Sequence, residues 1–189
     1  MSKIVERNIV SRKNVIVVAI AVAVFLFMAS GSFYRYIRGG GVSPFDFAAM
    51  LIIVLALVER AQGRYEYEAD AHRIRFCKLS WLGNKEYEVD YRQIIGIHEY
   101  KAKLIGYIKF RRTYRLNSAL DGRKVWVIAY KVAKSGKSEY NERIYFKPSD
   151  EMLNYLSGRM PGKVMVPENQ VVLEAFQSEE AEKELKAKK

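Results

Sequence analysis

The sequence predicts an α+β protein: an N-terminal transmembrane helical hairpin, then an antiparallel β-barrel or sandwich closed by a C-terminal helix. Two apolar runs, 15–30 and 45–58, lie close together and hold almost no ionisable side chain. Beyond residue 60 the hydrophobic period changes to two, as in half-buried strands. From Ser149 the period is again that of a helix.

These changes of pattern divide the 189-residue chain into four parts. Residues 1–13 form a basic lead-in and residues 14–60 form the hairpin. Residues 61–166 form the β module, whose closing helix we expect over 149–160. The charged tail, 167–189, is expected to be helical or disordered.

A membrane span needs roughly 17–25 residues, and the first apolar run is long enough when the interfacial aromatics Phe33 and Tyr34 after it are included. The run itself holds no ionisable side chain. The second run is shorter and carries Asp46, which its place at the start of the run would put among the headgroups. One alternative is a pair of buried helices, although a chain of this size offers little core to bury them. Another is a cleaved signal peptide, with small residues at 29–32.

The distribution of Lys and Arg predicts the orientation of the hairpin. The lead-in and the segment after the second run carry more positive charge than the joint between the runs, although Arg35 and Arg38 in that joint oppose this assignment. We therefore expect a two-pass protein of the cell membrane with both termini in the cytoplasm. Residues 39–41 are all glycine, but no Lys-Ser or Lys-Thr follows, so they indicate a turn rather than a phosphate-binding loop.

The first three predicted strands, 65–69, 73–79 and 85–90, carry complementary charges. The outward side chains are acidic on the first strand, basic on the second and acidic on the third. Opposite charges across an antiparallel pair stabilise it by roughly 0.2–1 kcal/mol each. We therefore interpret the repeated glutamates as the surface of a sheet and not as catalytic carboxylates.

Further strands are predicted over 94–100, 104–116, 125–132 and 139–147, and the helix over 149–160 follows them. Trp126 lies among valines and isoleucine, which favours a place in the core. Trp81 lies beside a turn and fits either the core or an interface.

This layout resembles a pleckstrin-homology-like (PH-like) domain, and the whole chain resembles bacterial membrane proteins in which a two-helix hairpin precedes a bacterial PH-like domain. The resemblance covers roughly residues 14–160. Besides the hairpin, it is carried by residues 73–76, a turn at Gly83, the segment 88–97 and the segment 143–149. It implies a PH-like fold and no shared catalytic residues, and such folds host many unrelated binding functions.

Composition limits the chemistry. The net charge is +11, but no nucleic-acid-binding motif accompanies it. The single Cys77 cannot form an internal disulfide bond, and the two histidines are not at metal-ligand spacing. No nucleophile elbow or phosphate loop is present. We therefore expect no enzymatic activity, no cofactor, no metal, no nucleic acid and no small-molecule substrate.

The strongest candidate for a binding site is the basic stretch 101–124, in which aromatic residues lie between the cations and Asp121 is the single acid. It could bind anionic lipid or an acidic partner, or it could be a solvated strand face. Its cations are Lys101, Lys103, Lys109, Arg111, Arg112, Arg115, Arg123 and Lys124.

Two functions remain open. The first is a non-enzymatic, membrane-anchored scaffold or interaction module at the cytoplasmic face, with a protein partner or a second copy of the chain bound to it. The alternative is a reader of anionic lipid headgroups that uses the basic stretch. In both cases membrane lipids surround the hairpin.

Overall fold

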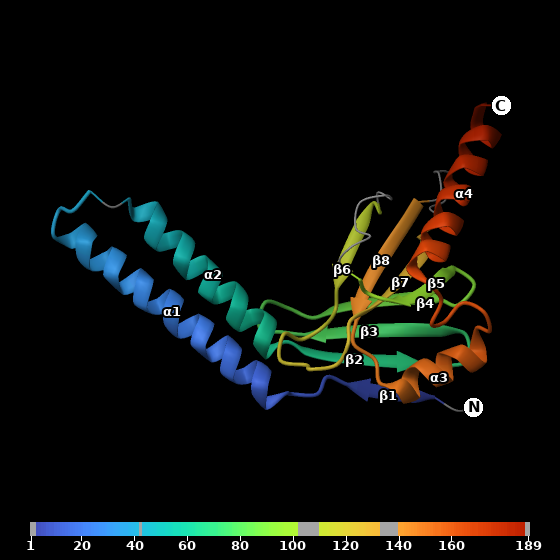
Figure 1. Ribbon diagram of the computed structural model, residues 1–189, viewed down its shortest axis with the longest axis horizontal. Helices are drawn as coiled ribbons and strands as arrows, with labels where there is room; N and C mark the ends of the chain where they lie inside the picture. The colour runs from blue at the N-terminus through green and yellow to red at the C-terminus, as the bar shows by residue number, and fades with distance from the viewer. Residues whose placement is uncertain (1–2, 42, 102–109, 133–139, 188–189) are drawn as a thin grey trace.

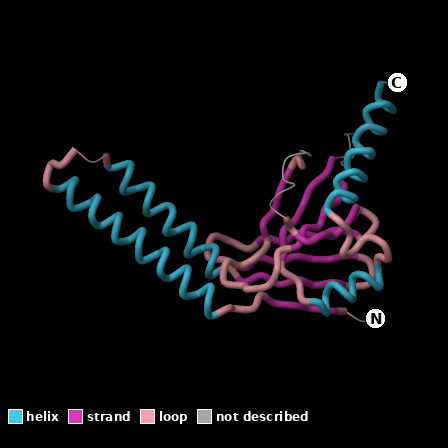
Figure 2. The backbone as a smooth tube through the Cα atoms, viewed as in Figure 1, coloured by secondary structure: helices cyan, strands magenta, loops and turns pink. Residues whose placement is uncertain are grey.

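The computed structural model describes residues 3–41, 43–101, 110–132 and 140–187. In this part of the chain the fold is α+β, with two four-stranded sheets and four helices. A pair of antiparallel helices extends from one end of the sheets, and a further helix projects from them (Figures 1 and 2). The helices are α1 (Arg12–Ile37), α2 (Pro44–Gln62), α3 (Asp150–Arg159) and α4 (Glu168–Ala187).

The first sheet has the order β1-β2-β3-β4 and is antiparallel throughout. Its strands are β1 (Ile4–Arg7), β2 (Arg64–Ala69), β3 (Arg73–Leu79) and β4 (Lys85–Asp90). β1 precedes the helical pair and β2 follows it, so the two helices are an insertion between neighbouring strands. Sequence analysis missed β1 because one of its two inner positions, Glu6, is charged and breaks the apolar alternation.

The predicted charge complementarity of this sheet is confirmed. Arg75 on β3 reaches Glu86 on β4 at 2.9 Å and Glu68 on β2 at 3.9 Å. β1 adds a second basic strand on the other side of β2, where Arg7 contacts Glu66 at 2.9 Å. These pairs are largely exposed, so each contributes at most about 1 kcal/mol and together they favour one register.

The second sheet has the order β5-β7-β8-β6. Its strands are β5 (Ile94–Glu99), β6 (Arg112–Arg115), β7 (Trp126–Val132) and β8 (Tyr140–Phe146). Of the expected antiparallel barrel or sandwich, the described strands form two separate sheets and no closed barrel. The expectation that all strands are antiparallel is wrong, because β6 pairs with β8 in parallel. Between β6 and β8 the chain returns through β7, which is antiparallel to β8. As a result β6 and β8 point the same way. Of the strand expected over 104–116, residues 104–109 lie outside the described residues.

The core lies between the two sheets and α3. Tyr67, Phe76 and Phe146 have no solvent exposure, and their rings contact one another edge to face at centroid distances of 5.5–5.8 Å. The predicted closing helix is confirmed as α3, whose first turn is capped by the Ser149 side chain. Trp126 packs partly buried against this core.

α4 covers part of β5 through Val171 and Ala175, which are buried. The close approach depends on Gly96, since a Cβ atom there would lie 2.6 Å from Cγ2 of Val171. Val171 is β-branched and stiff in a helix, so it cannot turn aside without cost.

We expect Gly96→Ala to destabilise the packing of α4 by about 1–3 kcal/mol, because overpacking displaces one element from the other. Amide hydrogen exchange along α4 should speed up, whereas exchange in β2 and β3 should not change. The double variant Gly96→Ala/Val171→Ala removes the clash and should restore slow exchange. Equal exchange in all three proteins would show that α4 does not depend on this contact.

α1 has 26 residues and mean hydropathy 2.6 over its most apolar window, and nearly all of it is exposed. Among the described helices it alone is long and apolar enough to cross a membrane. The predicted pair of spans is therefore only half supported, because α2 has 19 residues and carries Asp46, Glu59 and Arg60. The two helices nevertheless pack along each other, with the rings of Phe33 and Phe47 5.3 Å apart.

Candidate membrane-facing site

The loop 116–125, between β6 and β7, joins the helical pair to the sheets. Its Leu120 carbonyl accepts a hydrogen bond from the backbone of Ser11 at 2.8 Å, and its Ala119 amide donates to the Arg60 carbonyl at 3.4 Å. The Asn14 side chain donates to the carbonyls of Ala119 and Asp121 at 3.2 and 3.1 Å. The loop therefore holds the first turn of α1 and the last turns of α2, which fixes the direction in which both helices leave the sheets.

Four charged side chains from this loop and its neighbours compose the joint cluster. Two of them, Asp121 and Arg123, belong to the loop, and the other two are Glu6 of β1 and Lys147, which follows β8. Arg123 donates to Asp121 at 2.6 Å and also pairs with Glu6, while Lys147 donates to the Asp121 backbone carbonyl. The Asp121 side chain has no solvent exposure. Burial lowers the pKa of Arg123 and of Lys147. The cluster holds two positive and two negative charges, so it is neutral as a whole.

The joint cluster also contacts the start of α3. Glu6 accepts hydrogen bonds from the backbone and hydroxyl of Ser149 at 3.0 and 3.1 Å. Ser149 caps α3, so β1, the loop and the closing helix meet at one buried group of charges. A buried group of paired charges at this meeting point favours one relative placement of the three elements.

Among the described residues of the predicted basic stretch, the cations do not gather into one patch. Arg123 belongs to the joint cluster, and Lys124 pairs with Glu99 at 3.1 Å. Arg111 stacks over the Tyr140 ring at 4.3 Å. Arg112 and Arg115 are exposed on β6, and Lys101 is exposed before it. Lys103 and Lys109 lie outside the described residues.

A different group of residues gathers where α2 meets the sheets. Arg60 of α2 and Arg115 of β6 line the same cavity together with Trp81 and Leu82 of the β3–β4 turn. Trp81 and Leu82 are 60% and 68% exposed, which is unusual for large apolar side chains in a turn. The question of Trp81 is thereby answered: it lies at the surface beside α2.

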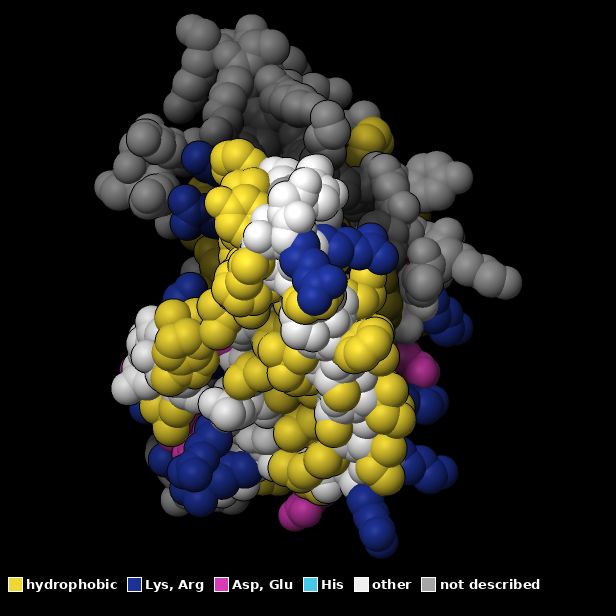
Figure 3. Space-filling model, turned by 90° about the vertical axis from the view of Figure 1, so that its left-hand side faces the viewer, with side chains coloured by type: hydrophobic (Ala, Val, Ile, Leu, Met, Phe, Trp, Pro, Cys, Tyr) yellow, Lys and Arg dark blue, Asp and Glu magenta, His cyan; other side chains and the backbone are white. Residues whose placement is uncertain are grey.

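The face that carries this group is the one from which the helices extend. Seen from that side in Figure 3, hydrophobic side chains cover much of the helical pair, and Lys and Arg side chains lie around it and also near the middle of the view. An apolar projection surrounded by cations matches a bilayer, whose interior is hydrocarbon and whose surface is anionic.

Sequence reasoning missed Arg60 and Leu82 as site residues. The pair Trp81 and Leu82 directly before Gly83 could have indicated a binding surface, because turns exposed to solvent are usually built from polar residues, Gly and Pro.

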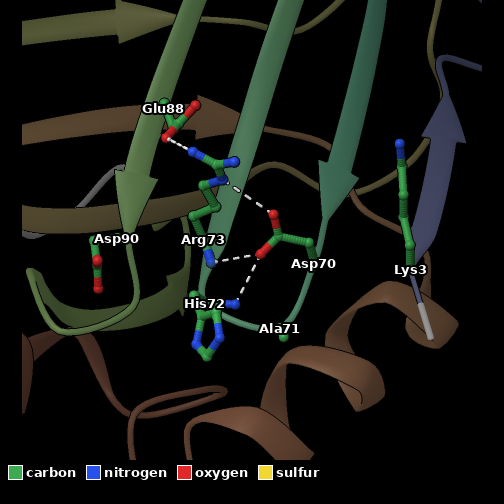
Figure 4. Close-up of a pocket in the computed structure, with 7 residues that line it drawn as sticks. All are labelled: Lys3, Asp70, Ala71, His72, Arg73, Glu88 and Asp90. Carbon is green, nitrogen blue, oxygen red and sulfur yellow. Dashed lines mark hydrogen bonds and ion pairs between the residues drawn. The ribbon is translucent and has the colours of Figure 1, made fainter. Parts of the chain in front are cut away.

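A second cavity lies at the far end of the first sheet, around the β2–β3 turn (Figure 4). Asp70 accepts hydrogen bonds there from the backbone of His72 and Arg73 at 2.8 and 3.0 Å, and from the Arg73 side chain at 3.1 Å. These donors lower the pKa of Asp70 to about 2. Arg73 also contacts Glu88 at 2.5 Å, so the charged groups satisfy one another and the cavity is the surface of a turn.

Within the described part of the chain, no three His, Cys, Asp or Glu side chains are placed to share a metal ion. His98 is buried, which lowers its pKa. Burial, reinforced by nearby glutamates, raises the pKa of Cys77, which makes its thiol a poor nucleophile.

Comparisons of the chain with protein-family models, with curated proteins and with solved structures find no match. The resemblance to the bacterial PH-like group therefore stays an expectation from the sequence.

Proposed function

We propose that the protein is a non-enzymatic, membrane-anchored interaction module that presents its two sheets at the cytoplasmic face of the cell membrane. In this proposal α1 crosses the bilayer and α2 returns beside it. At 1.5 Å per residue α1 is about 39 Å long and α2 about 28 Å, against a hydrocarbon thickness of about 30 Å. Phe45, Ile52 and Leu55 on α2 are exposed, as side chains that contact lipid would be.

The observation that carries the proposal is the joint between the helices and the sheets. A flexible tether would suffice to keep a domain near a membrane. Here hydrogen bonds from Ser11, Asn14 and Ala119 fix both helices to the loop 116–125. A domain held in one orientation presents the same surface to every partner on the membrane, which suits a scaffold subunit.

The surface that we assign to the protein partner is α4. This helix extends beyond the sheets in Figure 1, and it packs on β5 only through one side. Leu173 and Phe176 are 58% and 47% exposed and lie three residues apart, so they form one apolar spot on the helix. A partner with a hydrophobic groove, or α4 of a second copy, would cover this spot.

The test uses the full-length protein, solubilised in mild detergent at native expression level. We expect one protein, or a second copy of the chain, to be retained in fixed ratio at high salt, because the contact is apolar. Leu173→Glu/Phe176→Glu should abolish this retention.

The matched control is Gln170→Glu/Gln177→Glu, which adds the same charge to the same helix at exposed polar positions. This control should keep the partner. A wild-type protein that is monomeric and retains no protein would refute the proposal, and so would equal retention by the Leu173→Glu/Phe176→Glu variant.

The alternative, a reader of anionic headgroups through residues 101–124, receives less support. Arg123 and Lys124 are already paired, and the remaining described cations do not converge. Arg115 is the exception, since it lines a cavity together with Arg60.

A further inference from the structure

A groove lies between the base of α2 and the β3–β4 turn, with a cavity volume of about 490 Å³. One wall is a stripe of α2 formed by Ile52, Leu55 and Ala56, whose spacing of three and four residues places them on one side of the helix. The other wall is the pair Trp81 and Leu82. Both walls are apolar and exposed, since Ile52 and Leu55 are 65% and 53% exposed.

The end of the groove nearest the sheets is basic. It contains Arg60, Lys78 and Arg115 against the single acid Glu59. Glu59 is already neutralised by Lys78 at 2.6 Å, and both side chains are mostly buried. Burial alone would lower the pKa of Lys78, but its hydrogen bond to Glu59, with a contribution from Tyr65, outweighs this and raises it. Lys78 therefore stays charged and paired.

Arg60 and Arg115 remain as the two cations that no described carboxylate pairs. Both are exposed, and both also line a second, smaller cavity that adjoins Tyr145 and Asn117. The Arg115 guanidinium lies 5.9 Å from the centre of the Tyr145 ring, and this contact restricts the Arg115 side chain. Two guanidinium groups at one end of an apolar groove are complementary to a phosphate with a hydrocarbon chain attached.

We propose that this groove binds one anionic phospholipid. Arg60 and Arg115 bind the phosphate, an acyl chain lies along Ile52 and Leu55, and Trp81 and Leu82 enter the bilayer interface beside it. The inference rests on the proposed membrane insertion, because the apolar wall is continuous with the surface of α2 that would face lipid.

Continuity with the helix is also what favours a lipid over a peptide. The wall formed by Ile52 and Leu55 belongs to a helix that leads away from the sheets toward the tip of the helical pair, so a ligand must be apolar along its length and anionic at one end. Tryptophan is enriched at the headgroup level of membranes. Trp81 lines the same cavity as the C-terminal part of α2, so it lies beside the end of that helix.

The test measures lipid bound to the full-length protein by native mass spectrometry in mild detergent. Phosphatidylglycerol and phosphatidylcholine are offered separately at matched concentrations. We expect one phosphatidylglycerol molecule per chain to be retained, and at least tenfold weaker retention of phosphatidylcholine. Arg60→Gln/Arg115→Gln should reduce phosphatidylglycerol binding at least tenfold.

The matched control is Arg111→Gln/Arg112→Gln, which removes the same charge from two exposed arginines, one at the start of β6 and one directly before it. It should bind phosphatidylglycerol as the wild type does. A second variant, Trp81→Ser/Leu82→Ser, keeps every charge and should also weaken binding. Circular dichroism of each variant verifies that the fold is intact.

Three outcomes would overturn the inference: no retained lipid, equal retention of the two lipids, or an equal loss in the control. Failure of the membrane proposal itself would be seen separately. Alkaline carbonate would then release the wild-type protein from membranes, whereas a protein that stays in the membrane but lacks a retained lipid refutes only the groove.

Discussion

Replacing Asp121 with alanine should destabilise the protein by about 3–5 kcal/mol, the range for breaking a buried ion pair by removing one partner. Asp121 accepts hydrogen bonds from the Arg123 side chain and from the backbone of Ile9 and Arg123. Without its carboxylate the joint cluster carries a net positive charge away from water. Urea unfolding of the full-length protein in detergent, followed by tryptophan fluorescence, measures the loss.

The reason for the size of this effect is the charge balance of the cluster, which a double variant tests. Asp121→Ala/Arg123→Ala leaves Glu6 and Lys147, so the remaining charges are again balanced. The double variant should therefore cost less than the sum of the two single variants, which is the signature of direct coupling.

Arg7→Ala serves as the surface control. The Arg7 side chain is 78% exposed and pairs with Glu66, so its loss should change the free energy of unfolding by less than about 1 kcal/mol. If Asp121→Ala costs no more than Arg7→Ala, the joint cluster does not hold the domain together.

The sequence predicted well those elements whose pattern is local. The strands 73–79 and 85–90, the opposed charges on their outer face and the helix capped by Ser149 all follow from alternation and capping within a few residues. The structure gives β3, β4 and α3 within one residue of these ranges.

Long-range features could not be read in the same way. β1 pairs with β2 over long sequence separations, 59 positions between Arg7 and Glu66 and 65 between Ile4 and Ala69, and the whole helical pair lies between the two strands. The parallel pairing of β6 with β8 depends on which edge of the sheet the chain returns to. Neither is encoded in the spacing of apolar residues.

The candidate site shows the same division. A basic stretch in the sequence suggested one patch, but folding directs Arg123 inward and Arg115 toward α2. Proximity in sequence indicates which charges share a strand, such as Arg112 and Arg115 on β6. It does not indicate that the loop 116–125 pairs Arg123 with the buried Asp121. Arg60 and Arg115, 55 positions apart, become neighbours only through the joint.

The placement of β1 predicts a second large loss of stability, which we expect in a fragment that starts after the two helices. A fragment of residues 63–189 contains everything that sequence analysis assigned to the β module except its first two residues. It lacks β1, and with it Glu6, so Arg123 loses one of its two carboxylate partners and Ser149 loses its acceptor. We expect this fragment to be less stable by at least about 3–5 kcal/mol than the same module with β1 present.

The comparison chain keeps β1 and omits the helices. Asn8 and Tyr65 already exchange hydrogen bonds, from the Asn8 amide to the Tyr65 carbonyl at 3.0 Å and from the Tyr65 amide to the Asn8 side chain at 2.9 Å. A short glycine-rich turn from Val10 to Arg64 would therefore join two antiparallel neighbours, which need only a brief connection. This joined chain should fold in water without detergent.

Urea unfolding of the two soluble chains, followed by tryptophan fluorescence, gives the difference directly. Glu6→Ala in the joined chain separates the two causes: if it loses most of the gain, the buried ion pair dominates, and if it loses little, the strand pairing does. Equal midpoints for the fragment and the joined chain would instead mean that β1 is dispensable. A module that needs the strand before its helical pair cannot be detached from the two helices by a cut at one end, because β1 and β2, on the two sides of the insertion, are parts of one sheet.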